Sequence, residues 1–251
     1  MIASFPMYDR PSTRAGYDAL WVLIRDNLRD AGLDAPDALD HEMPHLDTWA
    51  QDDLVLGQIC NLPLRAKFAP TVTVIGTADY GLPDCPPGHY NTLFIVRGDS
   101  DVTDPYAAMQ QRFVINDYMS QSGFGAAHQM AARKGIDLVP QLASGAHALS
   151  LRAVATGAAD CASIDAQTWR HLCADDPLSQ EVRVIGQTQS SPAMSLITAG
   201  QRDPAPYFAA IKAALAALPQ QHQDAIGWRD IVQLPDADYA LPIPALTQAV
   251  A

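Results

Sequence analysis

A polar turn with small hydroxyl residues lies near the middle of the chain, in the segment VINDYMSQSGFG at 114–125. Two apolar residues open the segment, and an alanine-rich helical pattern begins at Gly123, so we expect a strand, a turn and then a helix. Ser120 and Ser122 would then lie at a helix start, where N–H groups lack partners and the helix dipole is positive. Such a turn can hold an oxyanion. The alternative is an ordinary serine cap with a glycine in the first helical turn.

Polar turns follow other predicted strands as well, at 8–13, 58–61 and 144–147. Tyr8 comes just after the first strand, and Asp165 ends a strand of small residues. In open α/β sheets, ligands bind at the carboxyl ends of the strands. The convergence of these turns therefore supports a binding site more strongly than each turn does alone.

Composition limits the class of protein. The chain has 251 residues, of which 48% are apolar and 18% charged, which is typical of a globular protein of one large or two small domains. A net charge of −12 argues against a nucleic-acid surface, which needs clustered Lys and Arg. No apolar run is long enough for membrane insertion. The start, MIASFPMYDR, lacks the features of a signal peptide, so the chain as given is expected in the cytoplasm, or in the periplasm if a leader was removed.

The four cysteines do not form a metal-binding pattern. Their number permits disulfides, but none are paired at CxxC spacing, so no zinc site and no other metal or cofactor is expected. We interpret them as mostly buried thiols. They are Cys60, Cys85, Cys161 and Cys173.

Predicted strands alternate with predicted helices, which indicates an α/β protein with mostly parallel sheets. The clearest helix pattern begins after Thr13 and ends at Gly32, and the tail after residue 218 is predicted to be irregular. The chain is expected to leave one lobe near 94–98 and to return near 188–194. Lobe 1 would comprise 1–95 plus 192–251, and lobe 2 would comprise 96–191. The two crossings would form a hinge beside a ligand cleft.

The order of these motifs resembles that of the phosphate, phosphite and phosphonate substrate-binding proteins of ABC transporters, the periplasmic binding proteins related to PhnD. The matching pieces are PMYD at 6–9, GQICNLPL at 57–64, YNTLFIVRGDS at 90–100, VINDYMSQSG at 114–123, SGAHALSLRAVATGAADCASID at 144–165 and VIGQTQSSPAM at 184–194. The resemblance implies a two-lobe, type II periplasmic-binding-protein fold. In the most similar subgroup the piece CNLPL at 60–64 would read CGYPL, so a Gly and a Tyr that would line the cleft are absent here.

The resemblance also implies a role for each ligand-binding residue. Ser120, Ser122 and the N–H groups of Gly123 and Phe124 would bind the oxygens of a phosphorus oxyanion, with a further hydrogen bond from His147. Lobe 1 would supply Tyr8 and Tyr90 to close on the ligand, while Gln58 would contact either the ligand or the hinge. Asp165 would accept a hydrogen bond from an amino group or a protonated oxygen of the ligand.

Each of these residues also has a purely structural interpretation. His147 could simply begin its helix, and Asp165 could cap the helix predicted at 166–174. Tyr90 could only pack at the crossing, and Cys60 could be a buried turn residue.

The resemblance implies a non-catalytic receptor that captures a small anionic ligand, acts with an ABC permease and works as a monomer. One alternative is a biosynthetic enzyme that uses Cys60, His147 and Asp165 for acyl transfer. Another is a cytosolic sensor of small molecules with the same cleft and no permease.

Overall fold

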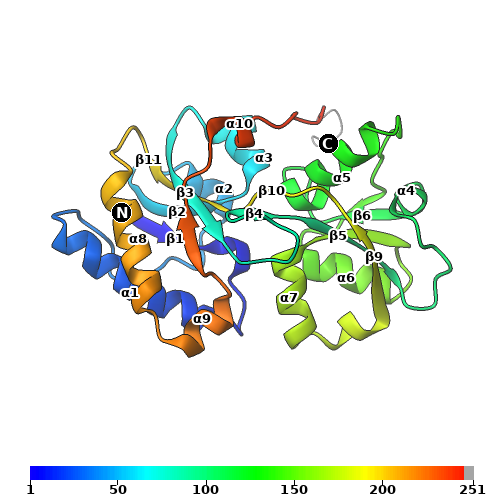
Figure 1. Ribbon diagram of the computed structural model, residues 1–251, viewed down its shortest axis with the longest axis horizontal. Helices are drawn as coiled ribbons and strands as arrows, with labels where there is room; N and C mark the ends of the chain where they lie inside the picture. Colours follow the sequence, from blue (N-terminus) through cyan, green and yellow to red (C-terminus); the bar gives the residue numbers. More distant parts are fainter. Residues whose placement is uncertain (246–251) are drawn as a thin grey trace. The chain divides into compact units, whose positions relative to one another are not determined.

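The computed structural model describes residues 1–245, which fall into two compact units (Figure 1). Unit 1 consists of Met1–His89 and Pro192–Tyr239, and unit 2 consists of Tyr90–Ser191 with the described residues after Tyr239. The chain therefore changes unit within β4 (His89–Tyr90) and again within β10 (Ser191–Pro192), and these two short strands pair with each other.

Unit 1 contains a five-stranded sheet in the order β1-β2-β11-β3-β12. The strands of this sheet are β1 (Ile2–Ser4), β2 (Leu54–Ile59), β3 (Val72–Asp79), β11 (Ser195–Ala199) and β12 (Asp230–Val232). Its helices and helical turns are η1 (Pro6–Tyr8), α1 (Arg14–Asp30), α2 (His45–Trp49), α3 (Asn61–Pro63), η2 (Leu64–Phe68), α8 (Ala205–Ala217), α9 (Gln220–Ile226) and α10 (Asp236–Tyr239).

The long helix α1 buries one apolar stripe in the core of unit 1. Its residues Tyr17, Leu20, Trp21, Ile24 and Leu28 recur at helical spacing, and all five are buried, which confirms the helix predicted from the sequence. The helix packs against α8 and α9 (Figure 1).

Unit 2 contains a second five-stranded sheet, in the order β7-β6-β8-β5-β9. Its strands are β5 (Thr92–Arg97), β6 (Phe113–Ile115), β7 (Leu142–Ala143), β8 (Cys161–Asp165) and β9 (Val182–Gln187). Its helices and helical turns are α4 (Pro105–Ala108), η3 (Gln121–Gly125), α5 (Ala126–Ala132), α6 (His147–Ala155), α7 (Ala166–Asp175) and η4 (Pro177–Glu181).

The central strands β5, β6 and β8 of unit 2 are buried on both faces of the sheet, toward which successive residues of a strand point in turn. Phe94 and Phe113 belong to one apolar cluster, whereas their neighbours Ile95 and Val114 belong to another. This two-sided burial explains why these three strands are mostly apolar. The lobe boundary expected after residue 95 lies inside β5, whose residues Thr92–Val96 pair with β8 within unit 2.

Two expectations about the fold are wrong. Both sheets are mixed, because β5 and β11 each run antiparallel to the two strands beside them. An apolar pattern shows where a strand lies but not which way it runs. β5 follows the entry of the chain into unit 2, and β11 follows its return to unit 1. The tail is also more regular than predicted: α9, β12 and α10 follow α8, and β12 pairs with β3.

Candidate functional site

The turn at 116–125 ends in a compact helical start that satisfies several of its own donors. Ser120 caps it, since the Ser120 Oγ accepts a hydrogen bond of 3.0 Å from the N–H of Gly123. The N–H groups of Phe124 and Gly125 both donate to the Ser120 carbonyl, at 3.1 and 3.0 Å. The bond from Gly125 to Ser120 spans five residues, which is the spacing of the π-helical turn η3. Such turns are frequent at functional sites.

This arrangement changes which groups can face a ligand. The N–H groups of Gly123 and Phe124, expected to bind oxyanion oxygens, donate within the turn instead. The ligand role of Gly123 stays a prediction, and the side-chain donors at this helix start are the two serine hydroxyls.

Two serines and a histidine come together at this turn, and we refer to Ser120, Ser122 and His147 as the hydroxyl–imidazole cluster. The Ser122 Oγ lies 3.1 Å from the His147 Nε2 and 3.5 Å from the Ser120 Oγ. Both serines are buried, and His147 is half-buried as the first residue of α6. Three of the residues predicted from the sequence therefore lie together in one cluster within unit 2.

The electrostatics of the cluster favour an uncharged imidazole. Burial lowers the pKa of His147 below its ordinary value of 6.5, while the charge of Asp165 and the main chain of Ser163 oppose this shift. At pH 7 the imidazole is therefore neutral, with one ring nitrogen that donates and one that accepts.

Two residues without an expected role hold the turn in place, and a third, Asn116, restricts Gly123 within it. Thr92 Oγ1 donates to the Ser122 carbonyl at 3.0 Å, and Ser163 Oγ donates to the Gly123 carbonyl. A Cβ atom on Gly123 would lie only 1.6 Å from the Asn116 Oδ1, so a side chain at this position must displace Asn116 or the turn. Thr92, Asn116 and Ser163 all lie in the quoted motifs, but the roles of Thr92 and Ser163 depend on pairing between strands and turns distant in sequence.

Asp165 is the cap of α7, as its structural interpretation proposed. It is 2% exposed, and its Oδ1 accepts a hydrogen bond of 2.8 Å from the N–H of Thr168. Thr92 is its register partner across β5 and β8. Its effect on the His147 pKa links it to the cluster, while direct contact with a ligand stays a prediction.

The other expected ligand residues are buried aromatic or amide side chains. In unit 1, Tyr8 packs edge-on against Tyr80, with 5.4 Å between ring centroids, and the Gln58 Nε2 donates to the Tyr80 hydroxyl at 3.1 Å. Thr13 Oγ1 donates to the Tyr8 carbonyl at 2.6 Å and fixes this turn. Tyr90, in β4, is 1% exposed. Tyr80, which contacts both Tyr8 and Gln58, was not singled out from the sequence.

The described cysteines are all free, and their environments differ. Cys60 and Cys161 are buried as expected, Cys85 is half-buried and Cys173 is exposed. Burial raises the pKa of Cys85 to about 11. Residues 1–245 contain no group of three or more His, Cys, Asp or Glu side chains able to hold a metal ion.

The three residues of the alternative enzyme are divided between the two units. Cys60 belongs to unit 1, whereas His147 and Asp165 belong to unit 2, where they serve the turn at 116–125 and the start of α7.

Residues 59–239 match the family of ABC-transporter phosphonate periplasmic substrate-binding proteins. This match spans well over half of the sequence. The chain belongs to this family. The family consists of solute-binding proteins and not of enzymes, so the chain is a solute-binding protein of the ABC-transporter type and the acyl-transfer alternative is not favoured. Its family is periplasmic and works with an ABC permease.

Solved structures show the same type II periplasmic-binding-protein fold. PhnD1 from Prochlorococcus marinus, in complex with methylphosphonate, has 14% identity and a TM-score of 0.69, covering 95% of this chain and 94% of that chain. A binding-protein component of an ABC phosphonate transporter from Pseudomonas aeruginosa has 16% identity and a TM-score of 0.65, covering 95% and 82%. ArtJ, the arginine-, lysine- and histidine-binding protein from Geobacillus stearothermophilus, has 13% identity and a TM-score of 0.59, covering 95% and 97%.

A search of the curated proteins finds no match. Within residues 1–245, every helix is too short or too polar to cross a bilayer.

Proposed function

We propose that the hydroxyl–imidazole cluster binds the oxygens of a small phosphorus oxyanion, namely a phosphonate, phosphite or phosphate. The observation that carries this proposal is the 3.1 Å approach of the Ser122 Oγ to the His147 Nε2, which brings two helix starts together. Each helix start adds a partial positive charge, so an anion is favoured there even though the chain has a net charge of −12.

The cluster supplies hydrogen-bond donors that suit a tetrahedral anion. Two serine hydroxyls can rotate toward separate oxygens, and the neutral imidazole of His147 can donate a third bond from the nitrogen that carries its proton. Hydrogen bonds to a charged acceptor are stronger than those between neutral groups. No catalytic group is required, because capture of the ligand changes no covalent bond.

Asp165 bears on which anion is preferred. A carboxylate near a dianion is repulsive, so Asp165 favours a monoprotonated ligand or one that carries an amino group. Members of this family deliver solute to an ABC permease in the periplasm, and we propose the same for this chain, acting as a monomer.

Thermal stabilisation by a panel of ligands tests the proposal. The panel consists of phosphate, phosphite, methylphosphonate and 2-aminoethylphosphonate, with arginine as an unrelated solute. At a ligand concentration a hundredfold above Kd, binding stabilises the native state by about 2.7 kcal/mol. We expect at least one phosphorus oxyanion, and not arginine, to raise the melting temperature.

Two variants and a control connect that shift to the cluster. Ser122→Ala and His147→Ala should remove the stabilisation, whereas Ser100→Ala, in the loop after β5, should keep it. The oxyanion role of the cluster would be contradicted if none of the four anions raised the melting temperature. It would also be contradicted if the rise were unchanged in both cluster variants.

A further inference from the structure

Two hydroxyl groups of the unit 2 sheet bind the main chain of the turn at 116–125. Thr92, the first residue of β5, donates from its Oγ1 to the Ser122 carbonyl at 3.0 Å. Ser163, in β8, donates from its Oγ to the Gly123 carbonyl. Both side chains are buried, and the two hydroxyls act on consecutive carbonyls at the start of η3.

The two hydroxyls lie on one face of the sheet. β5 and β8 are antiparallel neighbours in which Phe94 is the register partner of Ser163, and Thr92 is two residues before Phe94. Register partners and residues two apart in a strand point to the same face. Phe94 also belongs to an apolar cluster that includes Phe124 of η3. The turn is therefore attached to this face by apolar packing and by two hydrogen bonds.

The bond from Thr92 completes the restraint of one peptide unit in the turn. This unit joins Ser122 to Gly123, and its carbonyl accepts from Thr92. Its N–H, which belongs to Gly123, donates to the Ser120 Oγ at 3.0 Å. Because a peptide unit is planar, a hydrogen bond at each end fixes its orientation. The Ser122 side chain is attached next to this fixed unit.

The bond from Ser163 restrains the next peptide unit in the same way. This unit joins Gly123 to Phe124, and its carbonyl accepts from Ser163. Its N–H, which belongs to Phe124, donates to the Ser120 carbonyl at 3.1 Å. Two consecutive peptide units at this helix start are thus each held from both ends, by the sheet on one side and by Ser120 on the other.

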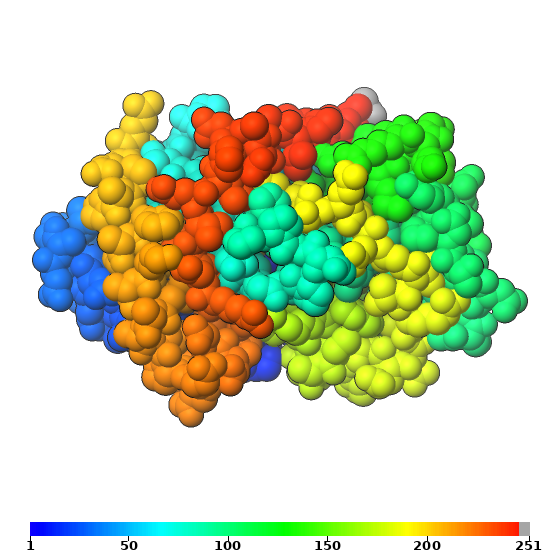
Figure 2. Space-filling view, viewed as in Figure 1, coloured from blue at the N-terminus to red at the C-terminus, as the bar shows by residue number. Residues whose placement is uncertain are grey.

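Thr92 is itself held firmly by its main chain. Its N–H donates to the Thr188 Oγ1 at 3.1 Å, and its carbonyl accepts from the Thr188 N–H at 2.9 Å. Thr188 follows β9, and its Oγ1 also donates to the Gln189 carbonyl at 2.9 Å. In Figure 2, the yellow segment around 185–195 lies against the turquoise segment around 85–95. The hydroxyl that holds the turn therefore comes from a main chain with little freedom to move.

We propose that Thr92 and Ser163 are positioning residues of the oxyanion site. Each hydroxyl proton is already used in a bond to the turn, so these residues act on the ligand through Ser122. They hold Ser122 where its hydroxyl reaches the anion, and a preorganised donor loses less conformational entropy on binding. The inference rests on the function proposed for the hydroxyl–imidazole cluster and adds two residues that bind no ligand themselves.

Removal of each hydroxyl tests the positioning role. Thr92→Val removes the hydroxyl and keeps the size of the side chain, and Ser163→Ala removes the second bond. Calorimetric titration of methylphosphonate should give a Kd about three- to tenfold higher for each variant than for the wild type, which is the usual net effect of one hydrogen bond. Thr92→Ser, which keeps the hydroxyl, should restore wild-type affinity. Ser163→Ala and Thr92→Ser carry the test if Thr92→Val does not fold.

Thr198→Val is the matched control for loss of a buried hydroxyl. Thr198, in β11 of unit 1, is fully buried, and its Oγ1 donates to the Leu54 carbonyl at 3.2 Å. The substitution should lower the free energy of unfolding and leave the Kd for methylphosphonate unchanged. An equal loss of affinity in Thr198→Val and Thr92→Val would show only a general loss of stability, and would overturn the positioning role.

A double-variant cycle tests whether Thr92 acts through Ser122. When Ser122→Ala has removed the serine hydroxyl, Thr92→Val should no longer change the Kd, so the two effects should be non-additive. NMR titration measures the weaker affinities. Additive effects would show that Thr92 acts on the ligand by another route, which contradicts the proposal.

The result for the wild type separates this inference from the proposed function. If the wild type binds none of the four anions, the oxyanion role of the cluster fails and the positioning role fails with it. If the wild type binds methylphosphonate, and Thr92→Val and Ser163→Ala bind it with the same Kd, only the positioning role is overturned.

Discussion

A side chain at Gly123 would collide with another residue of the turn at 116–125. A Cβ atom there would lie 1.6 Å from the Asn116 Oδ1, so Gly123→Ala must displace Asn116 or the turn itself. We expect a loss of about 1–3 kcal/mol in the free energy of unfolding, as for other overpacked buried sites, and at least a tenfold weaker affinity for methylphosphonate. Chemical denaturation and calorimetry measure the two effects.

A double variant is the control for Gly123→Ala. Asn116→Ala removes the obstructing oxygen, so Gly123→Ala should be less harmful in its presence, and the two changes should be non-additive. Additive effects would show that the clash with Asn116 is not the reason for a glycine at this position.

His147 provides a pH test of the cluster. Because burial lowers its pKa while Asp165 opposes the shift, NMR titration of the imidazole should give a midpoint below 6.5. Asp165→Asn keeps an oxygen that can cap α7 but removes the charge, so the midpoint should fall further. A midpoint above 6.5, or one that does not respond to Asp165→Asn, would contradict the described surroundings of His147.

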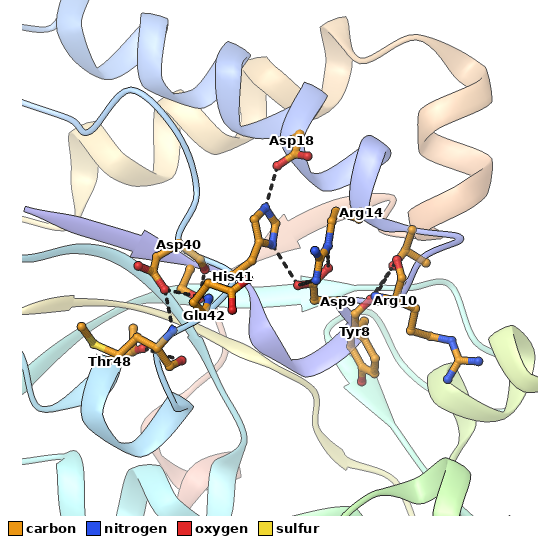
Figure 3. Close-up of polar contacts among 12 residues, drawn as sticks. Tyr8, Asp9, Arg10, Arg14, Asp18, Asp40, His41, Glu42 and Thr48 are labelled. Atoms are coloured by element: carbon orange, nitrogen blue, oxygen red, sulfur yellow. Dashed lines mark hydrogen bonds and ion pairs between the residues drawn. The ribbon is translucent and has the colours of Figure 1, made fainter.

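His41 connects the segment before α2 to the start of α1 (Figure 3). Its Nδ1 lies 2.8 Å from Asp9 and its Nε2 lies 2.9 Å from Asp18, while Arg14 also pairs with Asp9. Burial lowers the pKa of His41, but hydrogen bonds to the two carboxylates outweigh it and raise the pKa above 6.5. Glu42, next in the chain, adds negative charge near Arg14.

Stability should therefore depend on pH through His41. A raised pKa in the folded state gives stability that is fully present below pH 6.5 and is lost as the pH rises through the folded pKa. His41→Gln should thus destabilise the protein more at pH 5.5 than at pH 8.5, measured by denaturation at both values. His222→Gln, in α9, is the comparison variant, and an equal loss at both pH values for His41→Gln would refute the link.

Sequence patterns predicted elements where the signal is local. The helical spacing of Tyr17 to Leu28 predicted α1, and the short apolar run at 113–115 predicted β6. The direction of β5 and β11 and the existence of β12 escaped prediction, because these features depend on pairing with strands far away in sequence. β12 has three residues and pairs with β3, about 150 residues earlier.

The same distinction applies to the candidate site. Ser120 and Ser122 were predicted from a turn at the start of a helix, which is a local feature, and the role of His147 was implied by the family resemblance. The roles of Thr92 and Ser163 were not predicted, since each acts on a turn that another part of the chain supplies. Tyr80 was missed for the same reason: its partners Tyr8 and Gln58 lie on other elements of unit 1.

The protein as a whole carries a net charge of −12, yet the function proposed for it is anion capture. The proposal resolves this conflict locally, because helix starts, hydroxyl groups and a neutral imidazole attract an anion without a cluster of Lys or Arg. The two-unit division and the family match agree with a solute-binding protein, but only the ligand experiment tests the cluster itself.

The most direct test of the central claim is calorimetric titration of methylphosphonate into the wild type, Ser122→Ala and Ser100→Ala at one pH and salt concentration. Loss of a hydrogen bond to a charged group weakens binding by about 1.5–3 kcal/mol, or roughly 10- to 150-fold. We predict this loss for Ser122→Ala, and wild-type affinity for Ser100→Ala. Binding by the wild type with an unchanged Kd in Ser122→Ala would contradict the account.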